Sequence, residues 1–86
     1  MADIVIRYFA SAAEAAGVET ESVAALANGQ QLATVGELRS WLIDRYGGAM
    51  VRVLAAGSFL VDGVVSRDDS RPLGAQVDVM PPFAGG

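Results

Sequence analysis

The last six residues carry the clearest chemistry in this sequence. They read Pro81, Pro82, Phe83, Ala84, Gly85 and Gly86, and the carboxylate of Gly86 ends the chain. Glycine lets a backbone pass a narrow channel because it has no Cβ, and a terminal glycine carbonyl is sterically open to attack. Paired prolines favour a stiff, extended exit from the folded body. The pattern predicts a tail that is threaded into another protein; the alternative is a frayed end without a role.

The side chains that are missing exclude most enzyme chemistry. There is no Cys and no His, and all six basic residues are arginine, so there is no Lys either. These absences exclude thiolate nucleophiles, disulfides, Cys-ligated metals, Ser–His–Asp triads and Schiff bases. A chain of 86 residues also buries only about 60% of its unfolded surface, which leaves little room for a deep active-site cavity. We therefore expect catalytic groups to come from other proteins.

The charge and hydropathy of the chain limit the classes of partner that it can bind. The formal net charge is -4 and the arginines are scattered among acidic residues, a pattern that disfavours nucleic acid. No apolar run approaches the ~18 residues of a membrane span, and the start of the chain lacks a signal-peptide pattern. With 52% hydrophobic residues, the chain has enough apolar surface to fold as one domain. These features predict a cytoplasmic domain that binds no metal, cofactor, nucleic acid or membrane.

Hydrophobic periodicity predicts the strands that must hold the tail. Residues 3–10 alternate with period two, which indicates a strand, and a weaker strand is expected over residues 19–26. Asn28 and Gly29 predict a turn after this second strand. Asp62 and Gly63 separate two short apolar runs and predict a two-residue hairpin. Residues 76–80 form the last expected strand and lead directly into the tail.

Capping signals predict the helices. Thr34 and Glu37 form a capping box, so the main helix should cover residues 35–46. A shorter helix should follow Ser11 as its cap and stop at Gly17. A second short helix or helical turn is expected over residues 49–56, after the glycine pair of residues 47 and 48. One main helix over one face of a sheet makes a two-layer α+β domain whose other face is left to solvent or a partner.

The whole chain resembles the MoaD-type small subunit of molybdopterin synthase. The most specific element is the Pro-Pro-x-x-Gly-Gly ending of residues 81–86, which directly follows the hydrophobic strand end Val79-Met80. Residues 6–10, Ile-Arg-Tyr-Phe-Ala, are similar to the aromatic-rich first strand of that family. The resemblance implies an α+β, ubiquitin-like β-grasp fold, with a single mixed sheet covered on one face by one main helix. The domain would cover residues 1–80 and the extended tail residues 81–86.

The resemblance also implies a sulfur-carrier function. An E1-like adenylating and sulfurtransferase enzyme would use ATP to convert the Gly86 carboxylate into an acyl-adenylate, and a sulfur donor would turn it into a thiocarboxylate. The loaded tail, with Gly85, Ala84, Pro82 and Pro81, would enter the large subunit and give its sulfur to a cyclic pterin. The large subunit would supply the catalytic side chains in a heterotetramer, so the carrier itself binds no cofactor.

Four apolar residues are candidates for the contact with the large subunit. Phe9, Val65 and Met80 occupy outward-facing or hairpin positions, and comparison with the family places similar residues at this contact. Exposed apolar patches of this kind mark association sites. The alternative for Phe9 and Val65 is that they complete the core. Phe83 lies in the tail, where an aromatic ring can anchor in a partner's pocket.

Three other functions remain open from the sequence. The chain can be a sulfur carrier for thiamine or cysteine synthesis, although those thiamine-pathway carriers usually lack the paired prolines. It can be a ubiquitin-like modifier that forms amide bonds with lysines of other proteins. It can also be a small interaction domain with an idle tail.

Overall fold

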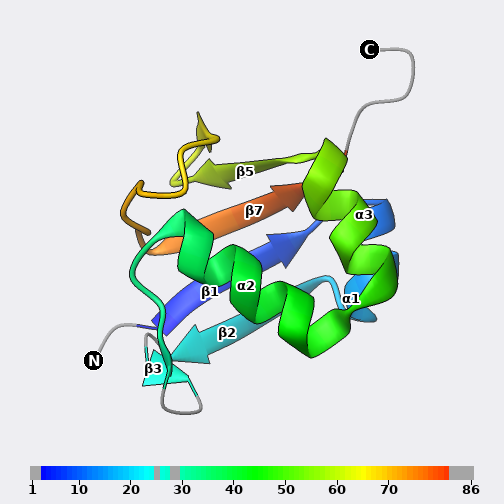
Figure 1. Ribbon diagram of the computed structural model, residues 1–86, viewed down its shortest axis with the longest axis horizontal. Coiled ribbons are helices and arrows are strands. Elements are labelled where there is room, and N and C mark those ends of the chain that lie inside the picture. Colours follow the sequence, from blue (N-terminus) through cyan, green and yellow to red (C-terminus); the bar gives the residue numbers. More distant parts are fainter. Residues whose placement is uncertain (1–2, 25, 28–29, 82–86) are drawn as a thin grey trace.

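A five-stranded mixed sheet forms the body of the protein (Figure 1). The computed structural model describes residues 3–24, 26–27 and 30–81. The strand order is β2-β1-β7-β5-β6, with β1 (Asp3–Tyr8) parallel to β7 (Gln76–Met80) at the centre. The outer strands β2 (Thr20–Ala24), β5 (Ser58–Val61) and β6 (Val64–Ser66) pair in antiparallel fashion. A separate two-residue ladder joins Leu26–Ala27 (β3) to Gln30–Gln31 (β4).

The alternation predicted for the first strand is confirmed. Ile4, Ile6 and Tyr8 are buried under the helices, while Arg7 points to the opposite face. Val77 and Val79 of β7 are buried beside them, in register with Ile6 and Tyr8. Period-two burial therefore divides the sheet into a covered face and an open face.

The Asp62–Gly63 hairpin is also confirmed. Both residues have positive φ, 48° for Asp62 and 85° for Gly63, as a type I′ turn requires. Val61 pairs with Val64 directly beside the turn. The Asn28–Gly29 turn expected after the second strand lies outside the described residues.

The main helix α2 (Val35–Tyr46) has the predicted bounds. The Glu37 amide donates to Thr34 Oγ1 at 3.3 Å, and the Thr34 amide donates to Glu37 Oε1 at 3.0 Å. This reciprocal pair satisfies two amides that would otherwise lack partners in the first turn. Gly47, with φ 67°, ends the helix and donates to the Ile43 carbonyl.

The cap predicted for the short helix α1 (Ser11–Ala16) is wrong. Ser11 is already helical, and Ala10, with φ 50° and no side-chain cap bond, occupies the N-cap. The Phe9 amide still donates to the Val79 carbonyl, and the chain turns at the very next residue, one position before the predicted cap. The stop at Gly17 is confirmed, because this residue has φ 79° and its amide donates to the Ala13 carbonyl.

Within the described residues, the main helix and two shorter helices together form the covered layer. The short helix expected before the hairpin exists as α3 (Gly48–Ala56) and begins one residue earlier than predicted. Figure 1 shows α2 and α3 across one face of the sheet, with α1 beside α3. A single core of buried apolar side chains joins the layers. The α+β β-grasp fold is thus confirmed, and no helix in the described parts has the length and hydropathy to cross a bilayer.

Candidate functional site

The tail leaves the sheet at the end of β7. Met80, the last strand residue, is half-buried, and Pro81 after it is buried. The remaining predicted tail residues lie outside the described part of the chain: Pro82, Phe83, Ala84, Gly85 and Gly86. Their roles, and the division into residues 1–80 and 81–86, therefore stay predictions. What the structure describes is the base from which the tail starts.

Gly57 holds this base against the end of α3. A Cβ at this position would overlap the Met80 carbonyl oxygen and would lie 2.8 Å from the Val53 carbonyl oxygen. Both obstacles are backbone atoms, which cannot rotate away as a side chain would. Glycine is therefore required for the close approach of α3 to the last strand residue. The sequence marked this residue only as a glycine between two predicted elements.

Phe9 and Met80 lie side by side on the open face of the sheet. The parallel register pairs Tyr8 with Val79, and its next step brings Phe9 level with Met80. The Phe9 amide donates to the Val79 carbonyl at 3.2 Å, which holds this alignment beyond the last paired residue. Phe9 is 37% exposed, so it does not complete the core.

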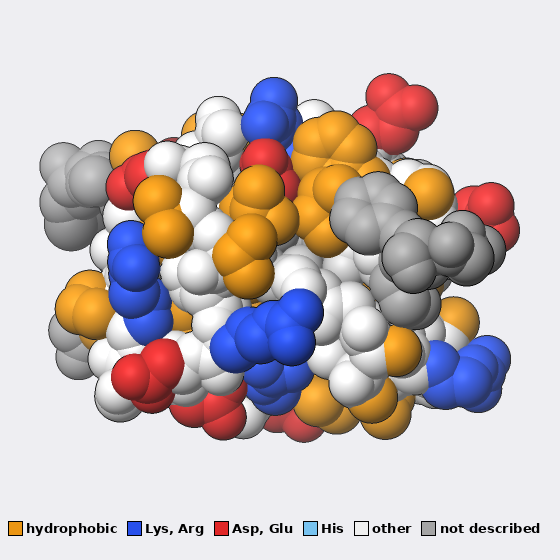
Figure 2. Space-filling model, turned by 90° about the horizontal axis from the view of Figure 1, so that it is seen from above, with side chains coloured by type: hydrophobic (Ala, Val, Ile, Leu, Met, Phe, Trp, Pro, Cys, Tyr) orange, Lys and Arg blue, Asp and Glu red, His pale blue; other side chains and the backbone are white. Residues whose placement is uncertain are grey.

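Val65 lies on the same face, on the edge strand β6. It pairs with Leu60 of β5, and Leu60 in turn pairs with Asp78 of β7. Val65 is 56% exposed. The structure therefore places the three described interface candidates on one face, with Leu60 as an additional member between them. Figure 2 looks down on the molecule from above and shows hydrophobic side chains gathered in its upper half. This half is the side of the molecule that is turned away from the viewer in Figure 1.

An ion pair that we did not predict occupies the middle of the open face. Arg7 Nε donates to Asp78 Oδ1 at 2.7 Å, and Nη2 donates to Oδ2 at 2.8 Å. Asp78 is only 6% exposed although it is on the outward side of its strand. The hydrogen bonds that Arg7 donates to Asp78, supported by the charge of that carboxylate, raise the pKa of Arg7 above its usual range. The Arg7 guanidinium also lies over the Phe9 ring, 5.4 Å from its centre.

A second polar cluster lies on the covered side, between β1, β2 and α2. The hydroxyls of Tyr8 and Tyr46 both donate to Glu21 Oε1, the latter at 2.6 Å. Arg45 Nε donates to the Tyr46 hydroxyl at 3.2 Å. Burial, followed by the bond to Glu21, raises the pKa of Tyr8 well above its usual range. Tyr8 therefore stays protonated, and the cluster connects α2 to the antiparallel pair of β1 and β2.

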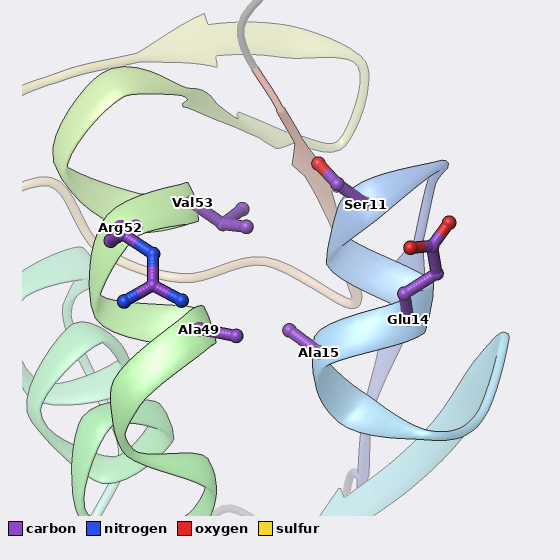
Figure 3. Close-up of a pocket in the computed structure, with 6 residues that line it drawn as sticks. All are labelled: Ser11, Glu14, Ala15, Ala49, Arg52 and Val53. Carbon is purple, nitrogen blue, oxygen red and sulfur yellow. The ribbon is translucent and has the colours of Figure 1, made fainter.

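A cleft of about 380 Å³ separates α1 from α3 (Figure 3). Ala15 and Ala49 point toward each other across it, and Val53 lies above them. Ser11 and Arg52 line its walls, together with Glu14. Glu14 is the one carboxylate among these lining residues, and no hydrogen bond joins it to the Ser11 hydroxyl. The lining of the cleft therefore shows no hydroxyl activated by a neighbouring base.

Groups able to hold a metal are also missing from what the structure describes. Within residues 3–24, 26–27 and 30–81, no three carboxylates gather to form a possible metal site. The adjacent acids Asp68 and Asp69 have protein partners: Ser70 donates to Asp68, and Arg39 donates to Asp69 at 3.3 Å.

Comparisons with known proteins agree with this architecture. The solution structure of the HVO 2177 protein of Haloferax volcanii is similar, with a TM-score of 0.70 and 26% sequence identity. The similarity covers 99% of this chain and 87% of that one. No curated protein matches the chain. The sequence profile of the ThiS family matches residues 6–86, and the chain therefore belongs to this family of ubiquitin-like sulfur carriers.

Proposed function

We propose that this chain is the sulfur-carrier subunit of a molybdopterin synthase. Membership of the ThiS family implies an E1-like adenylating enzyme and a sulfur-accepting enzyme as partners. The observation that carries the finer assignment is the Pro-Pro-x-x-Gly-Gly ending immediately after the last strand. Paired prolines are the feature by which the resemblance favours the molybdopterin pathway over thiamine synthesis.

The base of the tail supports this proposal. Pro81 is buried and Gly57 is packed against Met80, so the tail starts from a fixed point of the sheet. A fixed start reduces the conformational entropy that is lost when a tail enters a narrow channel. From Pro81 onward, five residues reach at most about 17 Å when extended, which sets the depth to which Gly86 enters its partner.

The proposed chemistry takes place at the Gly86 carboxylate. A carboxylate oxygen attacks the α-phosphorus of ATP held by the adenylating partner, and pyrophosphate leaves. A sulfide-level donor then attacks the acyl carbon, AMP leaves with the bonding electrons, and a thiocarboxylate remains. Activation is needed because oxide is a very poor leaving group, whereas AMP is a good one. The thiocarboxylate is a soft nucleophile at neutral pH, which agrees with a chain that has no His, Cys or Lys.

The open face supplies the surface on which a partner would rest. Phe9 and Met80 lie together beside the base of the tail, and Leu60 and Val65 extend the apolar surface across β5 and β6. A partner that covers this face would lie next to the base of the tail, so the tail could enter it directly. We propose that the large subunit binds here, with Phe83 as a further anchor in the tail, and that two carriers join a large-subunit dimer.

The decisive experiment follows sulfur from the donor to the acceptor. The chain is incubated with ATP, an adenylating partner and a sulfide source, and intact mass spectrometry detects exchange of one oxygen for sulfur. The loaded carrier is then given separately to a molybdopterin synthase large subunit with cyclic pterin and to a thiamine-pathway acceptor. We expect dithiolene formation with the first acceptor only. A chain without Gly85 and Gly86 is the control and should fold normally but take no sulfur.

Each other outcome points to a different function. Sulfur transfer to the thiamine acceptor alone would replace the pathway assignment while keeping the carrier function. An amide link to lysines of added proteins would favour the modifier. An unchanged mass in the presence of competent partners would reject the carrier function.

A further inference from the structure

We propose that Arg7, held by Asp78, is a specificity-determining residue that requires a neutral carbonyl oxygen on the acceptor subunit. This inference rests on the proposed function, because it concerns the contact between the open face and that subunit. The group that binds Arg7 is a main-chain or side-chain amide oxygen of the acceptor subunit. It accepts hydrogen bonds from the guanidinium N–H groups that Asp78 does not use.

Arg7 can still make further hydrogen bonds after its pairing with Asp78. A guanidinium has five N–H groups in a planar fork. Asp78 takes one from Nε and one from Nη2, and within the described residues the other three have no acceptor. The Arg7 side chain is 44% exposed, so water can satisfy these groups in the free carrier.

The Arg7 guanidinium is held in a fixed orientation. The two short bonds to Asp78 and the stacking on Phe9 hold Arg7 in one orientation. Asp78 itself is buried in the sheet face between β1 and β5 and cannot follow a moving partner. The free N–H groups therefore form a preorganised donor site.

A partner that covers the open face removes water from the free N–H groups of Arg7. Apolar neighbours such as Phe9, Met80 and Leu60 favour removal of water from the surface. Donors that lose water without gaining an acceptor carry a desolvation penalty, which is larger for charged groups. A purely apolar acceptor surface would therefore bind poorly, whereas one with an oxygen opposite Arg7 would bind well.

The charge around Arg7 decides which oxygen fits. Asp78 already neutralises the guanidinium, and Glu19 lines the same hollow of about 350 Å³ as Arg7, Phe9 and Thr20. A partner carboxylate in this hollow would meet two negative groups and only one positive group. An amide oxygen accepts the same hydrogen bonds without that repulsion.

The test compares binding of carrier variants to the molybdopterin synthase large subunit by calorimetry at low and high salt. The main variant, Arg7→Leu with Asp78→Leu, removes the donor and its partner together. Replacing an ion pair by apolar residues of similar size is often neutral or stabilising for the fold, and circular dichroism checks this. Arg52→Leu is the matched control, since it removes an arginine of α3 that lines the cleft on the other side of the molecule.

We expect the double variant to bind about tenfold to hundredfold more weakly, by the same factor at both salt concentrations, and the control to bind as wild type does. Equal or tighter binding of the double variant would overturn the inference. A loss that disappears at high salt would also overturn it, because it would indicate a carboxylate partner. If the wild-type chain itself fails to bind, the proposed function fails and this inference with it; wild-type binding with an unaffected double variant rejects the inference alone.

Discussion

Substitution of Gly57 by alanine tests whether the base of the tail depends on a close backbone contact. The added Cβ would lie 2.8 Å from the Val53 carbonyl oxygen and would overlap that of Met80. To reach ordinary van der Waals separation from Val53 alone, the backbone would have to move by at least about 0.6 Å. The contact lies between the end of α3 and the end of β7, so the movement displaces the point at which the tail begins.

The cost follows from overpacking between two rigid elements. Inserted methyl groups in tightly packed sites usually cost about 1–3 kcal/mol, and backbone obstacles favour the upper end of this range. Gly57 has φ -92° and ψ -160°, which alanine can adopt, so the lower entropy of the unfolded chain returns about 0.4–1 kcal/mol. We expect Gly57→Ala to lower the free energy of unfolding by about 2 kcal/mol, or the Tm by about 8–16 °C.

Chemical denaturation and sulfur-transfer rates together provide the assay. Gly48→Ala is the matched control, because a Cβ at this position of α3 meets no atom within 4 Å. It should be neutral or slightly stabilising, whereas Gly57→Ala should lose both stability and transfer rate at a temperature where it is still folded. If Gly57→Ala were as stable as Gly48→Ala, the close contact would not hold the tail base.

Three further predictions address the fold and the open face. Thr34→Ala removes the capping box of α2 and should lower the free energy of unfolding by about 1 kcal/mol in thermal denaturation; an unchanged Tm would show that the cap is dispensable. Because the pKa of Tyr8 is raised in the folded state, its contribution to stability is complete below the unfolded value of about 10 and should be lost as the pH rises above it. Tyr8→Phe should flatten this alkaline decline in denaturation curves, and a decline equal to that of wild type would assign it to another group. Met80→Asp should reduce affinity for the large subunit at least about tenfold without unfolding the chain, because it places a charge in the apolar surface. Val51→Asp on α3 is the control, since Val51 is an exposed valine elsewhere. Equal losses of affinity in both variants would remove Met80 from the contact.

The elements that could be predicted are those with a local cause. The reciprocal bonds of Thr34 and Glu37 are formed by residues three positions apart, so the start of α2 is encoded in four residues. The hairpin at Asp62 and Gly63 depends on two residues that tolerate positive φ. The failure at Ser11 has the opposite character, because the Phe9 amide bonds to Val79, far along the chain, and the chain turns directly afterwards at Ala10, one residue before the predicted cap.

The sequence by itself determined that this chain has no Cys, His or Lys, and from this came the prediction that its chemistry belongs to the carboxylate of Gly86. It also determined which strand positions face outward, since alternation depends on the chain alone. Only the tertiary structure decided that Arg7 meets Asp78, 71 positions away, and that Gly57 lies against Met80. Both contacts join segments that are far apart in the sequence. They depend on the register of the parallel strands β1 and β7 and on the packing of α3 against the end of β7. Register and packing are determined by burial of the whole core, so no local sequence pattern reveals them.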